Sequence, residues 1–143
     1  MTELLAVYGT LRRGGRLHAR LGSARGQTVY VGSAVILGHL YEVSADRRDD
    51  TVDVSYPCYY PGPSGHVVVD LYDVRDPTLW IELDELEGFH PDDLDQSEYH
   101  RRRVALLDVT PDDLEADQAW TYVYVGGLPD PARHIASGDW LIG

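Results

Sequence analysis

The chain has 143 residues, of which 43% are apolar, and this length and composition predict one folded domain over residues 1–143 with a core of its own. Its 24 acidic residues outnumber 12 basic ones, and the net charge of −12 argues against binding to nucleic acid or to anionic membranes. All the basic residues are arginine, so a Schiff-base lysine and a phosphate-binding Walker lysine are excluded.

Several other classes of protein lack support in the sequence. No charged segment followed by a long apolar stretch opens the chain, and no apolar run could span a bilayer, so we expect a cytoplasmic protein. The single cysteine, Cys58, excludes an intrachain disulfide and a multi-cysteine metal site. The six histidines lack metal-ligand spacing, and neither a Gly-x-Ser-x-Gly nucleophile motif nor a cofactor motif occurs. We therefore expect neither a metal nor a cofactor.

The first predicted element is a strand over residues 4–7, a short apolar run that ends at Tyr8 and Gly9. A buried strand that ends at a glycine turn leaves backbone N–H groups without a ladder partner, and such groups can bind a carboxylate or a phosphate. The alternative is an ordinary strand-to-loop turn. The arginines that follow, at positions 12, 13, 16 and 20, indicate a solvated face rather than a nucleic-acid patch, because no aromatic residues lie between them.

The middle of the chain is rich in β-branched and aromatic residues. Residues 28–31 and 34–43 are predicted strands, and residues 44–51 are a predicted exposed loop. Residues 56–63 combine three tyrosines with prolines that prevent a central strand, so we expect an irregular segment there. Its tyrosines could line a pocket or cover the core, and both interpretations remain open.

The remaining elements follow in order. Residues 65–74 form the clearest predicted strand, and residues 97–108 and 119–125 contain two more. Asp76 caps a predicted helix over residues 79–87, which Gly88 ends, while residues 129–143 are expected to be a tail. With a short helix expected near residues 16–21, the pattern predicts a mixed α/β or α+β domain built on a small curled sheet or β-barrel flanked by short helices.

One carboxylate of the helix is a candidate for proton transfer. Leu79, Leu83 and Leu86 form an apolar stripe at helical spacing, and Glu87 lies beside it. Glu82 and Glu85 fall on other sides and should be solvated. Partial burial and the negative end of the helix dipole would both raise the pKa of Glu87, which suits a group that takes and returns a proton. The alternative is an ordinary acid that extends into water from the helix end.

Two motifs carry a resemblance to a known family. The segment Tyr-Gly-Thr-Leu-Arg-Arg-Gly at 8–14 and the segment Leu-Asp-Glu-Leu-Glu-Gly at 83–88 resemble the two key motifs of the γ-glutamylcyclotransferase-like family, which includes AIG2-like and γ-glutamylamine cyclotransferase relatives. The strand at 65–74, the segment Tyr99-His100-Arg101 and the closing Gly-Asp-Trp-Leu at 138–141 also resemble family elements and stand in the family's order. The resemblance spans nearly the whole chain.

The resemblance implies an enzyme that cyclises the γ-glutamyl group of a small-molecule substrate to 5-oxoproline and releases an amine. It implies Glu87 as the catalytic base, and backbone amides of Tyr8, Gly9, Thr10 and Leu11 as the grip on the substrate's α-carboxylate. Tyr99 is a weaker candidate for the wall of the site. No nucleophile, metal or cofactor is implied, and we expect a monomer or a weak dimer.

Two other functions remain compatible with the sequence. A member of the same fold could bind a small metabolite without catalysis, because a retained pocket can serve binding alone. The same chemistry on a larger leaving group could remove a γ-glutamyl protecting group in a biosynthetic pathway. The segments 44–51 and 89–96 depart from the short loops of small bacterial members, so they put the choice of substrate in doubt.

Overall fold

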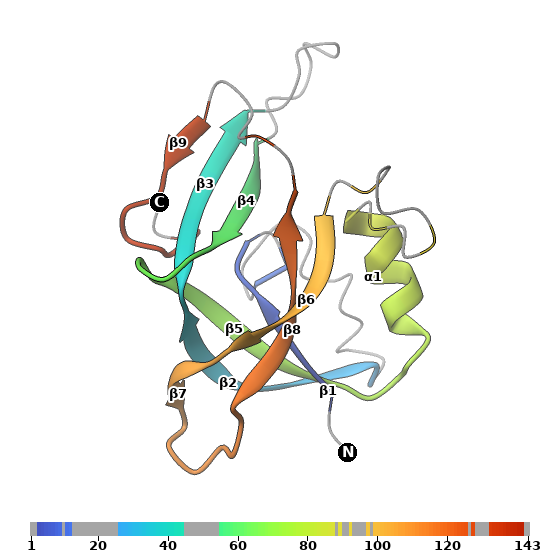
Figure 1. The fold of residues 1–143 in the computed structure, drawn as a ribbon. Helices are drawn as coiled ribbons and strands as arrows, with labels where there is room; N and C mark the ends of the chain where they lie inside the picture. The colour runs from blue at the N-terminus through green and yellow to red at the C-terminus, as the bar shows by residue number, and fades with distance from the viewer. Residues whose placement is uncertain are drawn as a thin grey trace.

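A computed structural model describes residues 3–9, 11–12, 26–44, 55–87, 89, 92, 97, 99–125, 127 and 132–141 (Figure 1). Two sheets and one helix make up this part of the chain. In order, the elements are β1 (Glu3–Val7), β2 (Thr28–Ile36), β3 (Gly38–Ser44), β4 (Ser55–Pro61), β5 (Val67–Val74), α1 (Leu79–Glu87), β6 (Tyr99–Ala105), β7 (Leu107–Thr110), β8 (Gln118–Tyr124) and β9 (Ala132–His134). No helix among these residues is long and apolar enough to cross a membrane. The predicted helix at 16–21 and the predicted loop at 45–51 lie outside the described residues.

The larger sheet is mixed and has the strand order β6-β8-β1-β5-β2-β7. β1 lies inside it, antiparallel to β5 and parallel to β8, which explains why its residues Leu5, Ala6 and Val7 are buried. Only Leu106 separates the edge strands β6 and β7 along the chain, so the sheet curls strongly on itself (Figure 1). No ladder joins these two edges in the described residues, so the curled sheet is confirmed and a closed barrel is not formed.

The predicted strand over residues 34–43 is wrong as a single element. β2 ends at Ile36, and β3 begins at Gly38 in a second sheet with the order β4-β3-β9. Gly38 has φ +137°, and a Cβ placed on it would lie 2.3 Å from the Tyr60 carbonyl oxygen. Glycine therefore permits the sharp change of direction between the sheets at this point.

Two further corrections concern the second sheet. The segment expected to be irregular contains the strand β4, which lies at the sheet edge, where prolines such as Pro57 and Pro61 are tolerated. The predicted exclusion of a central strand is therefore confirmed. The expected tail contains β9, a strand of three residues that pairs with β3. So short a strand carries no detectable periodicity of its own.

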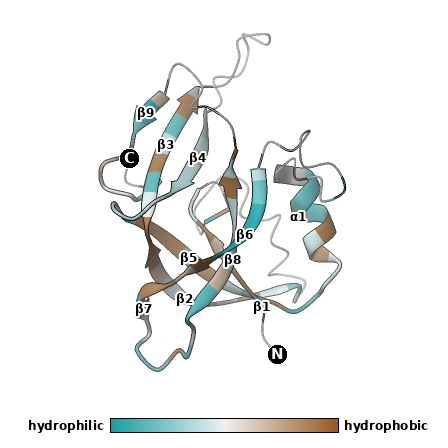
Figure 2. Ribbon diagram, viewed as in Figure 1, coloured by the Kyte–Doolittle hydropathy of each residue, from teal (hydrophilic) through white to brown (hydrophobic). Residues whose placement is uncertain are grey.

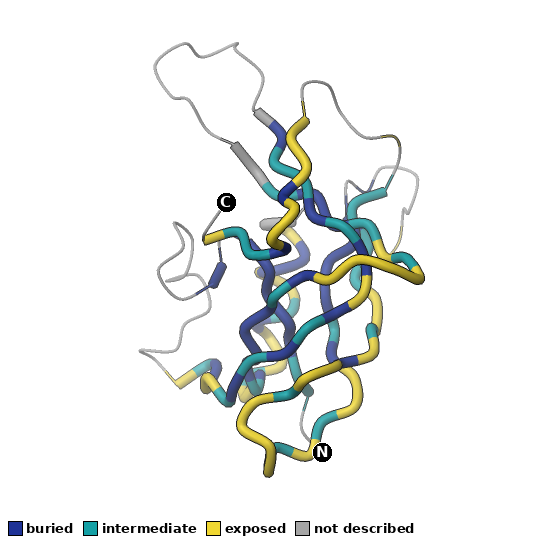
Figure 3. Tube along the Cα trace, turned by 90° about the vertical axis from the view of Figure 1, so that its left-hand side faces the viewer, coloured by how far each residue is buried: buried dark blue, intermediate teal, exposed yellow. Residues whose placement is uncertain are grey.

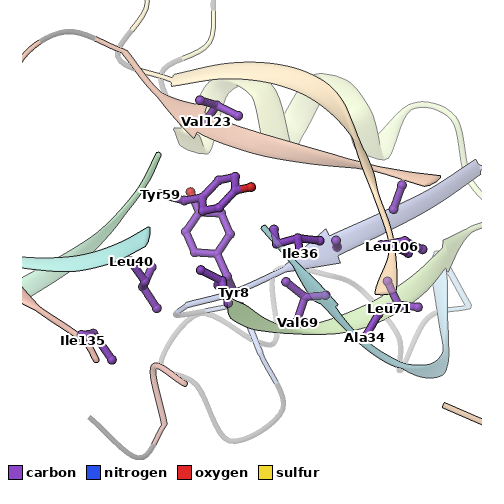
Figure 4. Close-up of a cluster of buried hydrophobic side chains, with 13 residues drawn as sticks. Tyr8, Ala34, Ile36, Leu40, Tyr59, Val69, Leu71, Leu106, Val123 and Ile135 are labelled. Carbon is purple, nitrogen blue, oxygen red and sulfur yellow. The ribbon is translucent and has the colours of Figure 1, made fainter. Parts of the chain in front are cut away.

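The main core lies between the two sheets and combines residues from both of them. Ile36, Val69 and Leu71 come from the larger sheet, whereas Leu40 and Tyr59 come from the smaller one (Figure 4). Figure 2 shows that β5 is hydrophobic along most of its length, while β6 is largely hydrophilic. The burial pattern agrees, since all eight residues of β5 are buried or half-buried inside the sheet. The edge strands β7 and β9, by contrast, are mostly or wholly exposed (Figure 3).

Candidate active site

The turn after β1 is the first part of the candidate site. Tyr8 and Gly9 are buried, and the Arg12 N–H donates to the Gly9 carbonyl oxygen at 3.0 Å, which closes the turn. Leu11 is also buried and packs into an apolar cluster with residues of α1. Of the four residues expected to hold the substrate here, Thr10 lies outside the described residues.

Pro57 of β4 is the common neighbour of this turn and Tyr99. A Cβ placed on Gly9 would lie 2.3 Å from Pro57 Cγ, so only glycine fits against the proline ring. The Tyr99 hydroxyl donates to the Pro57 carbonyl oxygen at 2.5 Å, and its ring packs edge-to-face on Tyr124 with centroids 5.1 Å apart. The predicted site residues Gly9 and Tyr99 therefore meet at one residue, although 90 positions separate them in the sequence.

Helix α1 forms the third part. The Asp76 carboxylate accepts hydrogen bonds from the Thr78 N–H at 3.0 Å and the Thr78 hydroxyl at 2.7 Å, which confirms the predicted cap. Leu79 and Leu83 are buried in the same cluster as Leu11 and Tyr99. The structure thus brings the described parts of both motifs and Tyr99 into one region.

The acidic residues of α1 differ in their environments. Glu82 and Glu85 are exposed, as predicted. Glu87 is the last residue of α1, and its side chain lies outside the described part of the structure. Asp84 is buried, and its carboxylate accepts a hydrogen bond from the Tyr122 hydroxyl at 2.7 Å.

Sequence analysis did not single out Asp84. Desolvation raises the pKa of its carboxyl group, while the hydrogen bond from Tyr122 and the charge of Arg101, whose Nη1 lies 3.7 Å away, oppose that rise. The same helical counting that selects Glu87 also places Asp84 near Trp80, four positions earlier. Asp84 could therefore have been found by testing every acidic residue of the helix, rather than the glutamates alone.

Tyr122 connects α1 to the turn after β1. Its hydroxyl donates to Asp84, and its backbone oxygen accepts a hydrogen bond from the Tyr8 hydroxyl at 2.6 Å. All three residues are buried, with exposed fractions of 3% for Tyr122, 6% for Tyr8 and 9% for Asp84. The two predicted motifs are thus linked through one residue of β8, whose side chain bonds to Asp84 and whose backbone bonds to Tyr8.

Arg12 corrects the expectation of a solvated arginine face. It is 7% exposed, its Nη1 lies 2.6 Å from Asp139, and its Nε lies 3.4 Å from Asp70. The other three arginines of that predicted face lie outside the described residues. Arg12 therefore holds the turn to β5 and to the C-terminal segment.

The tyrosines of the segment 56–63 divide between two environments. Tyr59 is buried in the main core and packs on Tyr8 with ring centroids 5.4 Å apart (Figure 4). Burial raises the pKa of Tyr59 to about 12. Tyr60 is half-buried and contacts the rings of Tyr41 and Tyr124. Tyr59 thus covers the core, whereas the side chain of Tyr56 lies outside the described residues.

Within the residues that the structure describes, no group of three or more histidine, cysteine, aspartate or glutamate side chains could hold a metal ion.

Comparisons with known proteins place these motifs in context. The model of a family described as gamma-glutamyl cyclotransferase, AIG2-like, matches residues 5–142. The solved structure of the protein ytfP from Escherichia coli is 27% identical, with a TM-score of 0.58, and the match covers 99% of this chain and 96% of that one. An AIG2-like protein from Mus musculus is 25% identical, with a TM-score of 0.59 and coverage of 90% and 80%.

The protein PH0828 from Pyrococcus horikoshii has a TM-score of 0.65 at 22% identity, with coverage of 96% of this chain and 89% of that one, and it shows a likeness of fold. No curated protein was found to match the chain.

Proposed function

The chain belongs to the gamma-glutamyl cyclotransferase, AIG2-like family, and we propose that it cyclises the γ-glutamyl group of a γ-glutamyl amine or peptide to 5-oxoproline. The observation that carries this proposal is the shared cluster of Leu11, Leu83 and Tyr99, which unites the turn after β1, α1 and β6. A γ-glutamyl group held beside that cluster could contact all three elements at once.

The proposed reaction takes place within a single substrate molecule. The nitrogen of the substrate's α-amine attacks its own γ-carbonyl carbon, and the new C–N bond closes a five-membered ring. The bond between that carbon and the leaving nitrogen then breaks, which releases the free amine and 5-oxoproline. Because both reacting groups belong to one substrate, the protein contributes mainly by holding the chain bent, and the reaction as written requires no metal or cofactor.

Glu87 is the proposed general base. It removes a proton from the attacking α-amine, whose reference pKa is about 8, and returns that proton to the leaving nitrogen. Its position in α1 supports this role, because it follows the buried residues Leu83 and Asp84 by four and three positions. Asp84 is the less suitable base, since Tyr122 and Arg101 already engage its carboxylate.

The turn after β1 is the proposed binding site for the substrate's α-carboxylate. The backbone of Tyr8, Gly9, Thr10 and Leu11 would hold this group and stabilise the oxyanion that develops on the γ-carbonyl. Backbone binding explains how a protein of net charge −12 can take an anionic substrate. Tyr99 would form the adjacent wall, with its ring fixed by Pro57 and Tyr124.

The proposal is tested by incubating the purified protein with a panel of γ-glutamyl amines and γ-glutamyl dipeptides and measuring 5-oxoproline. We expect release by the wild type and a loss of kcat by about 100-fold or more in Glu87→Gln, because the amide keeps the shape of the side chain but removes the base. Calorimetry with an uncleaved substrate should give a similar Kd for both proteins. Glu85→Gln, which changes an exposed acid of the same helix, is the matched control and should retain full activity.

Each contrary outcome identifies the part of the proposal that is wrong. Equal release of 5-oxoproline by the wild type and Glu87→Gln would show that Glu87 is not the base, while the proposed reaction would still be supported. Binding of γ-glutamyl compounds without any release would favour a metabolite-binding protein. Release restricted to substrates with large leaving groups would favour removal of a γ-glutamyl protecting group.

A further inference from the structure

We propose that Asp84 is a positioning residue of the cyclisation, which fixes the C-terminal half of α1 against the turn at Tyr8 and Gly9 through Tyr122. This inference rests on the proposed function, because it assigns to Asp84 the task of holding Glu87 at a fixed position relative to the turn that binds the substrate's carboxylate.

The first observation is the cost of burying Asp84 on an otherwise amphipathic helix. A carboxylate in an apolar cluster lowers stability unless hydrogen bonds and opposite charge compensate it. Asp84 has both, from the Tyr122 hydroxyl at 2.7 Å and from Arg101 at 3.7 Å. An apolar residue at this position would anchor the helix equally well by packing alone, so the carboxylate supplies something that packing does not. A hydrogen bond to β8 and an ion pair with β6 together restrict the rotation and the axial position of α1.

The second observation is that Tyr122 also contacts the turn after β1. Tyr122 lies on β8, and its backbone oxygen accepts the hydrogen bond of the Tyr8 hydroxyl at 2.6 Å. Tyr8 is the first residue after β1, which ends at Val7, and the turn begins there. A displacement of Asp84 would therefore be transmitted through Tyr122 to the start of the turn.

The third observation is that Arg101 is itself held in place. Its guanidinium lies 4.7 Å from the Trp80 ring centroid and 5.5 Å from that of Trp120, so aromatic rings of α1 and β8 flank it. Two residues earlier on β6 is Tyr99, on the same side of the strand. Asp84 thus connects α1 to both strands that border the candidate site.

Among the described residues, Arg101 of β6 and Tyr122 of β8 are the ionisable groups in contact with Asp84, and Glu87 follows it by one helical turn on α1. Loss of the contact with Tyr122 should therefore lower kcat more than it changes KM, because the substrate still binds at the turn while Glu87 is misplaced. A general loss of folded protein would not separate the two constants in this way.

The test compares Asp84→Asn and Tyr122→Phe with the wild type, using the γ-glutamyl substrate that the wild type turns over fastest. We expect Asp84→Asn to lower kcat about tenfold and to leave KM within about twofold. Tyr122→Phe removes the hydrogen bond but keeps the carboxylate of Asp84, and it should also lower kcat with little change of KM. Glu82→Gln removes an exposed charge from the same helix and serves as the control, with no expected change.

The outcomes separate this inference from the proposed function. If the wild type releases no 5-oxoproline from any substrate of the panel, both the proposed function and the positioning role of Asp84 are overturned. An active wild type with an unchanged kcat in Asp84→Asn would overturn the positioning role alone. If kcat in the Asp84→Asn variant falls only in proportion to the fraction of folded protein, as measured by thermal unfolding, Asp84 has a structural role and no positioning role. If Asp84→Asn does not fold, Tyr122→Phe decides, and an unchanged kcat in that variant would overturn the inference.

Discussion

Arg12 illustrates why single residues were the hardest part of the site to assign from sequence. The four residues that follow it in the chain are arginines and glycines, which indicate an exposed turn. Its actual partners, Asp70 and Asp139, lie 58 and 127 positions away, and no local pattern records them. Asp84 was missed for a related reason, because its importance depends on Tyr122 and Arg101 in other elements. Gly9 and Tyr99, by contrast, belong to motifs of recognisable spacing, and both contact Pro57, while their roles toward a substrate stay predictions.

Replacement of Arg12 by methionine should strongly destabilise the protein. The variant keeps much of the side-chain volume but leaves Asp70 and Asp139 without their buried cation, a loss worth about 3 kcal/mol in the free energy of unfolding. Denaturant unfolding monitored by circular dichroism measures this difference. The matched control is Arg75→Met, which breaks the exposed pair with Asp73 and should cost less than about 1 kcal/mol. Equal, small losses in both variants would show that the buried pairs of Arg12 contribute little.

At the scale of elements, helices and strands could be predicted where a short stretch of sequence carries its own pattern. β5, β8 and α1 were found because an apolar run, an aromatic alternation and an Asp-Pro-Thr cap are each contained within a few residues. β4 and β9 were missed because pairing with β3, rather than their own sequence, makes them strands. The break between β2 and β3 was missed as well, since the surroundings of Gly38 matter more than the continuity of apolar residues.

The cap of α1 gives a prediction about pH. Hydrogen bonds from the Thr78 hydroxyl, from Gln27 and from the Thr78 N–H hold the pKa of Asp76 below its reference value of 3.8. A group whose pKa is lower in the folded state stabilises the protein above the unfolded-state pKa and loses that contribution as pH falls through the folded-state value. Asp76→Ala should therefore lower Tm clearly at pH 7 and less at pH 3.

Thermal unfolding at the two pH values measures this effect, and the exposed substitution Glu85→Ala should leave Tm nearly unchanged at both. A loss of Tm that is equal at pH 7 and pH 3 would mean that the charge of Asp76 does not contribute to the cap.

At the scale of the whole molecule, the two sheets depend on one another. The main core takes Val69, Leu71 and Val123 from the larger sheet and Leu40 and Tyr59 from the smaller one (Figure 4). The C-terminal segment adds main-chain bonds to both, from the Ile135 N–H to the Leu40 oxygen at 2.8 Å and from the Val68 N–H to the Gly138 oxygen at 2.7 Å. The larger sheet also packs on α1 through a second apolar cluster, but Leu40 and Tyr59 of the smaller sheet belong to the core that both sheets share. We therefore propose that the chain folds as a single cooperative domain.

Ile135→Ala tests that cooperativity. Ile135 is 2% exposed and belongs to the core shared by both sheets, so its truncation should lower the free energy of unfolding by about 3 kcal/mol. Trp80 in α1 and Trp120 in β8 report through fluorescence once Trp140, which packs against the shared core, is replaced by phenylalanine in every protein compared. Far-UV circular dichroism reports on all the strands. If the sheets unfold together, the two signals have one midpoint in the wild type and shift equally in the variant. Leu141→Ala, at an exposed position of the same segment, should shift neither signal. Separate midpoints, or a shift seen by circular dichroism alone, would mean that the smaller sheet unfolds on its own.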